Sequence, residues 1–168
     1  MIARFEMVSF ERFAADMAVS CPELSPEQVR AAYEGIRLPK RATTGSAGYD
    51  FMLPYDLTLK AGEGALVPTG IRAWMRQDYV LLLMPRSSLG FKFRLQLDNT
   101  VGVIDSDYYG SDNEGHIRIK ITNDSREAKT LELKAGAGLA QGIFLPYGTA
   151  EEEEVTRVRN GGLGSTDK

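Results

Sequence analysis

The sequence is poor in the residues that form covalent cross-links and metal sites. Its 168 residues include one cysteine, Cys21, and one histidine, His116. A single cysteine excludes an internal disulfide, and a lone histidine is better explained as a strand residue than as a metal ligand. The chain is long enough to bury a core in one domain without such supports. These features predict a globular protein of the reducing cytoplasm.

Long apolar runs and an excess of positive charge are also lacking. No stretch approaches the roughly 20 apolar residues of a membrane-spanning helix, and charges stand near the start where a signal peptide needs an apolar run. The 23 acidic residues outnumber the 20 basic ones, for a net charge of -3. Because binding to a duplex needs a basic surface, we expect no nucleic-acid partner and no membrane partner. Any phosphate that the protein binds should belong to a small ligand in a local pocket.

Residues 1–36 predict a small α/β appendage docked on the main domain. Residues 3–8 alternate as a strand does, and Ser9 is a helix N-cap before apolar residues at i, i+3 and i+7. Ser25 forms a capping box with Gln28 and opens a second helix. The sequence assigns these elements no catalytic residue.

From residue 37 the pattern changes to short strands separated by glycine and proline turns. This pattern, with no long helix inserted, predicts an antiparallel sandwich, jelly roll or barrel over 37–148. Residues 149–168 form a glycine-rich tail that is either a disordered end or an arm that orders over a bound molecule. The predicted strands are 49–53, 57–59, 64–68, 71–74, 79–85, 95–104, 116–123, 130–133 and 139–146.

The stretch 97–110 predicts a site on a β-hairpin. Its β-branched residues favour a strand, and the polar residues that follow favour a tight bend, with Gly102 allowing close approach to the backbone. Asp105, beside this bend, could orient or deprotonate a water molecule. The alternative is that Asp105 and Asp107 cap a solvated turn.

Three further segments carry groups suited to phosphate. Residues 85–90 end an apolar strand and offer a guanidinium and two hydroxyls, which grip phosphate oxygens well. A carboxylate opens the strand at 49–53, and an amide stands at the start of the last strand. Taken singly, each segment could equally be a plain turn. The candidate residues are Arg86, Ser87, Ser88, Asp50 and Gln141.

Together and in this order, these segments resemble the motifs of the trimeric dUTPase family. The resemblance covers residues 36–168, and its strength lies in the concurrence of five motifs. They are Ala47-Gly48-Tyr49-Asp50, Pro85-Arg86-Ser87-Ser88-Leu89-Gly90, Asn99 to Tyr108, Gly136 to Gln141, and Arg159 to Thr166.

The resemblance implies a fold, an assembly and a reaction. It implies a jelly-roll subunit in a homotrimer, with active sites shared between subunits and the arm at 149–168 closing over a neighbouring site. The implied reaction is hydrolysis of dUTP to dUMP and pyrophosphate, which limits uracil in DNA and supplies dUMP. Mg²⁺ would be bound through the triphosphate, with no direct protein cage.

The resemblance also implies roles for single residues. Asp105 would activate the attacking water, and Tyr108 would pack against the deoxyribose and leave no room for a 2′-hydroxyl. The uracil would be read by Asn99 and the backbone of Gly102, Val103 and Ile104. The phosphates would be held by Arg86, Ser87, Ser88 and Gln141, with Asp50 as a supporting acid. The arm would contribute Arg159, Leu163, Gly164, Ser165 and Thr166.

The chain departs from the family pattern in three places. Ala137 and Gly138 stand where an Asp-Arg pair is usual, and Leu163 stands where an aromatic residue is usual. Residues 111–115 look like an insertion after the predicted hairpin. The sequence assigns no role to this insertion or to residues 1–36.

Two other functions fit parts of the pattern. A dCTP deaminase, or a bifunctional form, shares the fold and the Arg-Ser-Ser segment, but it needs an additional acid at the C4 atom of the base, for which the sequence offers no distinct candidate. A regulatory module could keep the nucleotide pocket and signal through residues 1–36. It would bind dUTP tightly and turn it over slowly.

Overall fold

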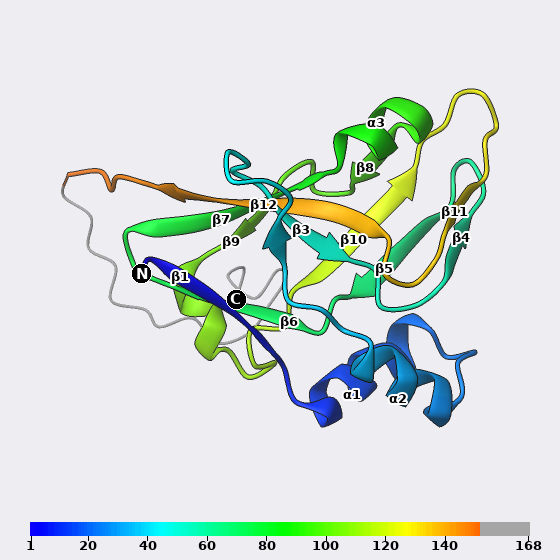
Figure 1. Cartoon of the computed structure of the whole chain (residues 1–168), viewed down its shortest axis with the longest axis horizontal. Helices are drawn as coiled ribbons and strands as arrows, with labels where there is room; N and C mark the ends of the chain where they lie inside the picture. Colours follow the sequence, from blue (N-terminus) through cyan, green and yellow to red (C-terminus); the bar gives the residue numbers. More distant parts are fainter. Residues whose placement is uncertain (152–168) are drawn as a thin grey trace.

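Short antiparallel strands are the main regular structure of the protein, whose computed structural model describes residues 1–151 (Figure 1). The predicted arm residues, Arg159, Leu163, Gly164, Ser165 and Thr166, lie outside the described residues. The strands are β1 (Ala3–Met7), β2 (Lys40–Arg41), β3 (Tyr49–Met52), β4 (Leu57–Leu59), β5 (Gly64–Pro68), β6 (Ile71–Met75), β7 (Tyr79–Pro85), β8 (Leu95–Leu97), β9 (Gly102–Ile104), β10 (Arg118–Asn123), β11 (Leu131–Leu133) and β12 (Gly138–Pro146). The helices are α1 (Phe10–Ser20), α2 (Pro26–Glu34), α3 (Ser87–Phe93) and the 3-10 helix η1 (Ser106–Gly110).

The strands are arranged in antiparallel sheets, as the sequence predicts. One sheet has the order β2-β3-β12-β7-β9 and a second has the order β5-β10-β8. Two further pairs of strands join β1 to β6 and β11 to β4. Strands that lie next to each other in a sheet are mostly far apart in the sequence. This crossing-over of strands is typical of jelly rolls, so the mainly β, antiparallel jelly-roll class is confirmed. In the part of the chain that the structure describes, no helix is long and apolar enough to cross a membrane.

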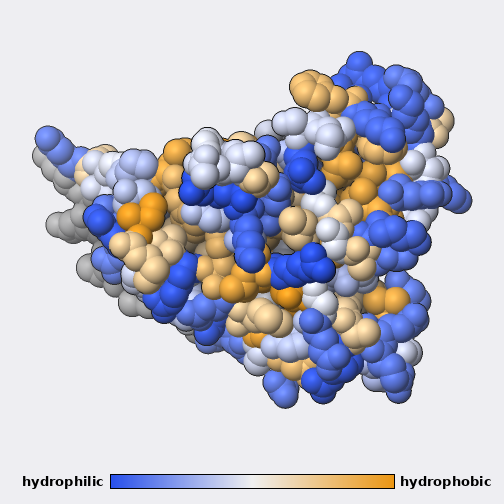
Figure 2. Space-filling model, in the orientation of Figure 1, coloured by the Kyte–Doolittle hydropathy of each residue, from blue (hydrophilic) through white to orange (hydrophobic). Residues whose placement is uncertain are grey.

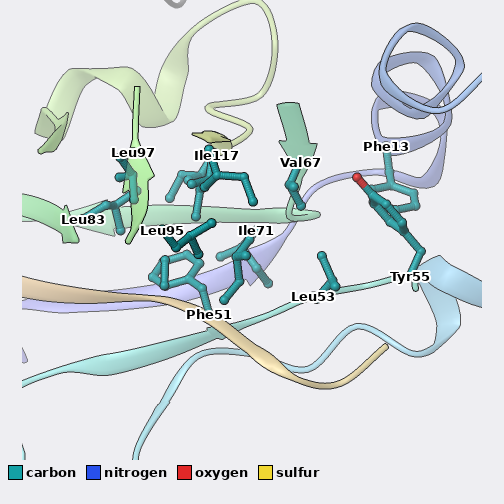
Figure 3. Close-up of a cluster of buried hydrophobic side chains, with 14 of the residues drawn as sticks. Phe13, Phe51, Leu53, Tyr55, Val67, Ile71, Leu83, Leu95, Leu97 and Ile117 are labelled. Atoms are coloured by element: carbon teal, nitrogen blue, oxygen red, sulfur yellow. The ribbon is translucent and has the colours of Figure 1, made fainter. Parts of the chain in front are cut away.

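Apolar side chains from the different sheets meet in one core (Figure 3). β6 and β10 show why, because their residues alternate between buried and more exposed positions, as one-sided strands do. Each fully buried large apolar side chain stabilises the fold by about 1.5–3 kcal/mol. On one face of the molecule, hydrophobic residues reach the surface in separate patches among hydrophilic ones (Figure 2). The core includes Phe51, Leu53, Leu83, Leu95, Leu97, Ile117, Ile119 and Ile121.

The N-terminal elements form as the sequence predicts. β1 pairs with β6 along its whole length. The side chain of Ser9 accepts a hydrogen bond from the Arg12 N–H and caps α1, and Ser25 and Gln28 form the capping box of α2. Helices α1 and α2 lie together at one end of the molecule (Figure 1), and the apolar side of α1 is buried in the core. The division of the chain at residues 36 and 148 stays a prediction.

The prediction of one strand over 95–104 is wrong. β8 ends at Leu97, and the Thr100 N–H donates to the Leu97 carbonyl oxygen at 2.8 Å to close a tight turn. Thr100 has a φ of 66°, in the left-handed region. β8 then pairs with β10, whereas β9 pairs with β7, so the expected β-hairpin is not formed. The polar residues at 98–100 break the strand despite apolar residues on both sides.

Helix α3 and the short strand β2 were not predicted. Residues 85–90 have the composition of a turn, but Ser87–Phe93 is helical and buries Leu89 and Phe93. Tertiary burial of these two side chains outweighs the weak helix propensity of serine and glycine. The remaining predicted strands differ from the observed ones by at most two residues at an end.

Candidate active site

A pocket of about 270 Å³ lies beside β9. Four residues that the sequence assigns to base and sugar recognition line it together: Asn99, Gly102, Val103 and Ile104. The sequence did not identify the other lining residues, which come from β7, β8, β10 and the turn after β8. They are Leu83, Leu97, Asp98, Arg118, Ile119 and Lys120.

This pocket suits a flat base with polar edges. Leu83, Leu97 and Ile119 give it an apolar wall. β9 is the edge strand of its sheet within residues 1–151, so one side of its backbone is available for hydrogen bonds to a bound molecule. Backbone groups on a strand read a hydrogen-bond pattern in fixed geometry. We call this the base pocket.

Charged residues stand at the rim of the base pocket. Asp98 accepts a hydrogen bond from the Thr122 hydroxyl at 2.6 Å and pairs with Lys120 at 3.1 Å. These two contacts hold the pKa of Asp98 below its ordinary value. The alternation of β10 predicts that Arg118 and Lys120 lie on one face. The alternation alone does not predict that this face borders residues 97–104, because the position of the face depends on strand pairing between distant segments.

Asp105 follows β9 directly and is the N-cap residue of η1. Its carbonyl oxygen accepts a hydrogen bond from the Tyr108 N–H at 3.2 Å. The Tyr108 ring is buried, its hydroxyl donates to the His116 carbonyl oxygen at 2.8 Å, and the Asn113 amide donates to that hydroxyl at 2.7 Å. The structure thus places Asp105 and Tyr108 immediately beyond the strand that lines the base pocket.

A second pocket, of about 510 Å³, contains every residue that the sequence assigns to the phosphates. It is open and polar, and it lies where β3, β12 and the end of β7 meet. We call it the phosphate pocket. Its lining comprises Ala42, Ser46, Ala47, Gly48, Asp50, Arg86, Ser87, Ser88, Gln141 and Ile143.

Strand register explains why these distant residues meet. β3 and β12 pair with Asp50 opposite Gln141, and β12 pairs with β7 with Ala140 opposite Pro85. Arg86 comes directly after Pro85, and its Nε lies 3.3 Å from Oδ1 of Asp50. The Gln141 amide donates to the Pro85 carbonyl oxygen at 3.3 Å. A guanidinium, hydroxyls and an amide therefore face one opening.

Gly138 gives the Arg86 side chain its space. A Cβ atom at residue 138 would overlap Nη1 of Arg86 and lie 2.8 Å from its Cδ. The guanidinium thus lies against the backbone of β12, at the position where the sequence departs from the Asp-Arg pattern. The absence of a side chain at residue 138 leaves room for Arg86, which follows β7 and is the N-cap residue of α3.

The two pockets share no lining residue among those that the structure describes. β7 lies between them, with Leu83 in the base pocket and its C-terminal end at the phosphate pocket. One pocket suits a base and the other suits phosphates, so each looks like half of a nucleotide site. Residues 1–151 contain no group of three or more His, Cys, Asp or Glu side chains arranged to hold a metal ion.

Taken together, the jelly roll and its two pockets define a nucleotide-binding protein. A family model described as dUTPase matches residues 34–167. The chain is 42% identical over 135 residues to the deoxyuridine 5′-triphosphate nucleotidohydrolase of Lactococcus lactis, covering 79% of this chain and 89% of the relative. It is 41% identical over 140 residues to that of Paraburkholderia xenovorans, covering 79% and 90%. This chain belongs to the dUTPase family.

Solved structures agree with this assignment. The crystal structure of dUTPase from Streptococcus mutans matches with a TM-score of 0.65 and 36% identity, over 88% of this chain and 98% of that one. The dUTPase from phage phi11 of S. aureus matches with a TM-score of 0.64 and 22% identity, over 94% and 97%. At that identity the phage protein supports the fold alone.

Proposed function

We propose that this chain hydrolyses dUTP by attack of a water molecule, activated by Asp105, on the α-phosphate. The activity follows from membership of the family: the chain is a dUTP diphosphatase that releases dUMP and pyrophosphate. The observation that supports the mechanism is the position of Asp105 at the end of β9, between the strand that lines the base pocket and η1.

The chemistry assigns a task to each pocket. Asp105 takes a proton from the water as its oxygen bonds to the α-phosphorus, and the bond from that phosphorus to the bridging oxygen breaks. Pyrophosphate leaves with the bonding electrons. Arg86 and the hydroxyls of Ser87 and Ser88 stabilise the charge on the phosphate oxygens, and Gln141 adds an amide donor. Asp50 holds the Arg86 guanidinium in place.

Recognition of the nucleoside falls to the base pocket and Tyr108. The backbone of β9 and the Asn99 amide pair with the uracil edge. This pairing rejects cytosine, in which N3 is an acceptor instead of a donor and the group on C4 is a donor instead of an acceptor. Tyr108 packs against the deoxyribose and leaves no room for a 2′-hydroxyl. The hydrogen bonds of its hydroxyl to His116 and Asn113 fix the ring in this position.

We also propose a homotrimer, in which the base pocket of one subunit completes the phosphate pocket of another. The absence of any shared lining residue between the two pockets of residues 1–151 supports this arrangement. A single substrate would then bridge two copies of the chain. The low cysteine content supports a cytoplasmic location for the enzyme.

The residues of the phosphate pocket fit Mg²⁺ bound through the substrate. The donors there are hydroxyls, an amide and one carboxylate, Asp50, which is already paired with Arg86. Such a set suits an ion that keeps phosphate oxygens and water as most of its ligands. When bound, the ion would neutralise charge on the triphosphate. A structure of a mutant dUTPase from phage phi11, at 21% identity, has a structural Mg(II) ion.

The Gly138→Ala variant tests the fit of Arg86 in the phosphate pocket. The added methyl group meets the flexible end of Arg86, so the fold should survive while the guanidinium moves. We expect kcat/KM for dUTP to fall by about 10-fold, the value of one weakened charge-assisted hydrogen bond. The control is Ala137→Ser, which also adds one heavy atom, at the position next to Gly138. Gly136→Ala is less suitable because Gly136 has a φ of 82°, where an alanine would strain the backbone. Unchanged kinetics for Gly138→Ala would contradict the assigned position of Arg86.

A nucleotide panel tests the function directly. The enzyme is incubated with dUTP, dCTP, dTTP and UTP, and pyrophosphate and ammonia are measured. We expect pyrophosphate from dUTP and little from the others. Ammonia from dCTP would show deaminase activity, and tight dUTP binding with negligible pyrophosphate release would show a regulatory module.

A further inference from the structure

Residues before position 36 contact the segment that follows Asp105 at three places. The Tyr109 hydroxyl donates to Oε2 of Glu6, Ser9 donates to Glu114, and Asp16 pairs with His116. Figure 1 shows β1 running beside η1, with α1 continuing below it. We call Glu6, Ser9 and Asp16 the N-terminal clamp, and residues 106–116 the clamped segment.

Glu6 and Arg72 together hold Tyr109, the first by a hydrogen bond and the second by a cation–π contact. The Glu6 carboxylate accepts from the Tyr109 hydroxyl at 2.7 Å, from Arg4 at 2.6 Å and from Arg72 at 2.8 Å. The Arg72 guanidinium also lies over the Tyr109 ring, 4.5 Å from its centre. Arg4 first, and then Tyr109 and Arg72, lower the pKa of Glu6 to about 2, so the acceptor stays ionised at neutral pH.

Glu114 holds the start of α1. Its carboxylate accepts from the Ser9 N–H at 2.8 Å and from the Ser9 hydroxyl at 2.5 Å. The Ser9 oxygen in turn accepts from the Arg12 N–H at 3.1 Å as the N-cap of α1. Glu114 belongs to the insertion at 111–115, so the insertion and the N-terminal helix depend on each other.

Asp16 anchors the far end of the clamped segment. His116 is fully buried, its Nδ1 lies 2.5 Å from Asp16, and its Nε2 accepts from the Gly70 N–H at 2.8 Å. That acceptor role places the single ring proton on Nδ1, where it is donated to Asp16. Arg118, 3.5 Å from Asp16, adds charge compensation. The His116 carbonyl oxygen is the acceptor of the Tyr108 hydroxyl, so the chain of contacts runs from α1 to Tyr108.

The clamped segment needs such support. η1 is a 3-10 helix of five residues, and short 3-10 helices have poor hydrogen-bond geometry and little stability of their own. It begins directly after Asp105 and contains Tyr108. One of the three contacts holds η1 itself, at residue 109, and the other two hold the residues after it, at 114 and 116.

We propose that residues 1–36 are a positioning element for catalysis, which fixes the clamped segment through Glu6, Ser9 and Asp16. This inference rests on the proposed roles of Asp105 and Tyr108. None of the three clamp residues lines either pocket, although Asp16 pairs with Arg118, which lines the base pocket. All three also lie before residue 34, where the match to the family model begins.

Tyr109→Phe and Tyr33→Phe form a matched pair for the test. Each removes one hydroxyl that makes one part-buried hydrogen bond, Tyr109 to Glu6 and Tyr33 to the Val8 carbonyl oxygen. Only the first bond reaches the clamped segment. Since misplacement of a reacting group is costly, we expect Tyr109→Phe to lower kcat/KM for dUTP by about 5- to 10-fold and to reduce the preference for dUTP over UTP. Tyr33→Phe should change both by less than about 2-fold.

Ser9→Ala and Ser25→Ala give a second pair. Both remove the side chain that caps an N-terminal helix, but only Ser9 bonds to Glu114. The Tm should fall in both variants. We expect only Ser9→Ala to lose activity and discrimination in the way that Tyr109→Phe does.

Amide hydrogen exchange provides a readout independent of turnover. The N–H groups of Tyr108 and Ser111 close the bonds within the clamped segment, to Asp105 and Tyr108 respectively. They should exchange faster in Tyr109→Phe and Ser9→Ala than in the two controls. Equal exchange and equal kinetics within each pair would overturn the clamp. Asp105→Asn is assayed alongside: if it retains full activity the proposed mechanism fails, whatever the paired variants show.

Discussion

Replacing Asp105 by asparagine is expected to lower kcat for dUTP by about 10²-fold or more, the range for loss of a general base. Asparagine has nearly the same shape, so the turn into η1 and the N-cap position should be retained. Binding of dUTP should change little, because the base pocket and the phosphate pocket are untouched. The measurement is pyrophosphate release under single-turnover conditions, together with binding of a non-hydrolysable analogue.

Asp107→Asn is the matched control for this experiment. Asp107 lies two residues further on, is exposed, and belongs to the first turn of η1. The same chemical change there should alter kcat by less than about 3-fold. A kcat for Asp105→Asn within about 3-fold of the wild type would exclude Asp105 as the base and return it to the role of a turn residue.

Replacing Arg86 by alanine is expected to lower kcat/KM for dUTP by about 10²- to 10³-fold, as loss of a preorganised donor to a developing charge does. The change also leaves Asp50 without its 3.3 Å partner, next to the phosphates that it would then repel. Arg86→Lys keeps the charge but loses the planar fork that holds two oxygens at once. It should therefore retain an intermediate activity.

Arg94→Ala separates this effect from a general loss of positive charge. Arg94 is the C-cap residue of α3, at the opposite end of that helix from Arg86. It pairs with Asp124 at 3.1 Å on the exposed surface. Steady-state kinetics on dUTP should be almost unchanged in this variant, since exposed pairs contribute little. If Arg86→Ala and Arg94→Ala gave the same small effect, Arg86 would have no place in phosphate binding.

Local signals in the sequence predicted much of the molecule. The helix caps at Ser9 and Ser25 depend only on a few adjacent residues, so the sequence alone predicts where both helices begin. Five residues that line the phosphate pocket, Asp50, Arg86, Ser87, Ser88 and Gln141, were predicted together from motifs, and strand register explains their proximity. Their roles in catalysis stay predictions.

The errors and omissions have physical causes. Burial of Leu89 and Phe93 makes 87–93 a helix, and a left-handed residue at Thr100 splits the strand predicted over 95–104. The clamp was beyond sequence reasoning because its partners are about a hundred positions apart. Nothing near Asp16 or His116 in the sequence indicates that these two side chains meet in the core.

The bond between Ser9 and Glu114 joins residues 105 positions apart, and this separation bears on the order of folding. α1 has 11 residues, too few for a stable helix in isolation, and it leaves the ribosome long before residue 114 is made. Contacts between such distant residues form late because closing a long loop costs entropy. We expect α1 to be among the last elements of the chain to become ordered, and the clamped segment to become fixed only at that late step.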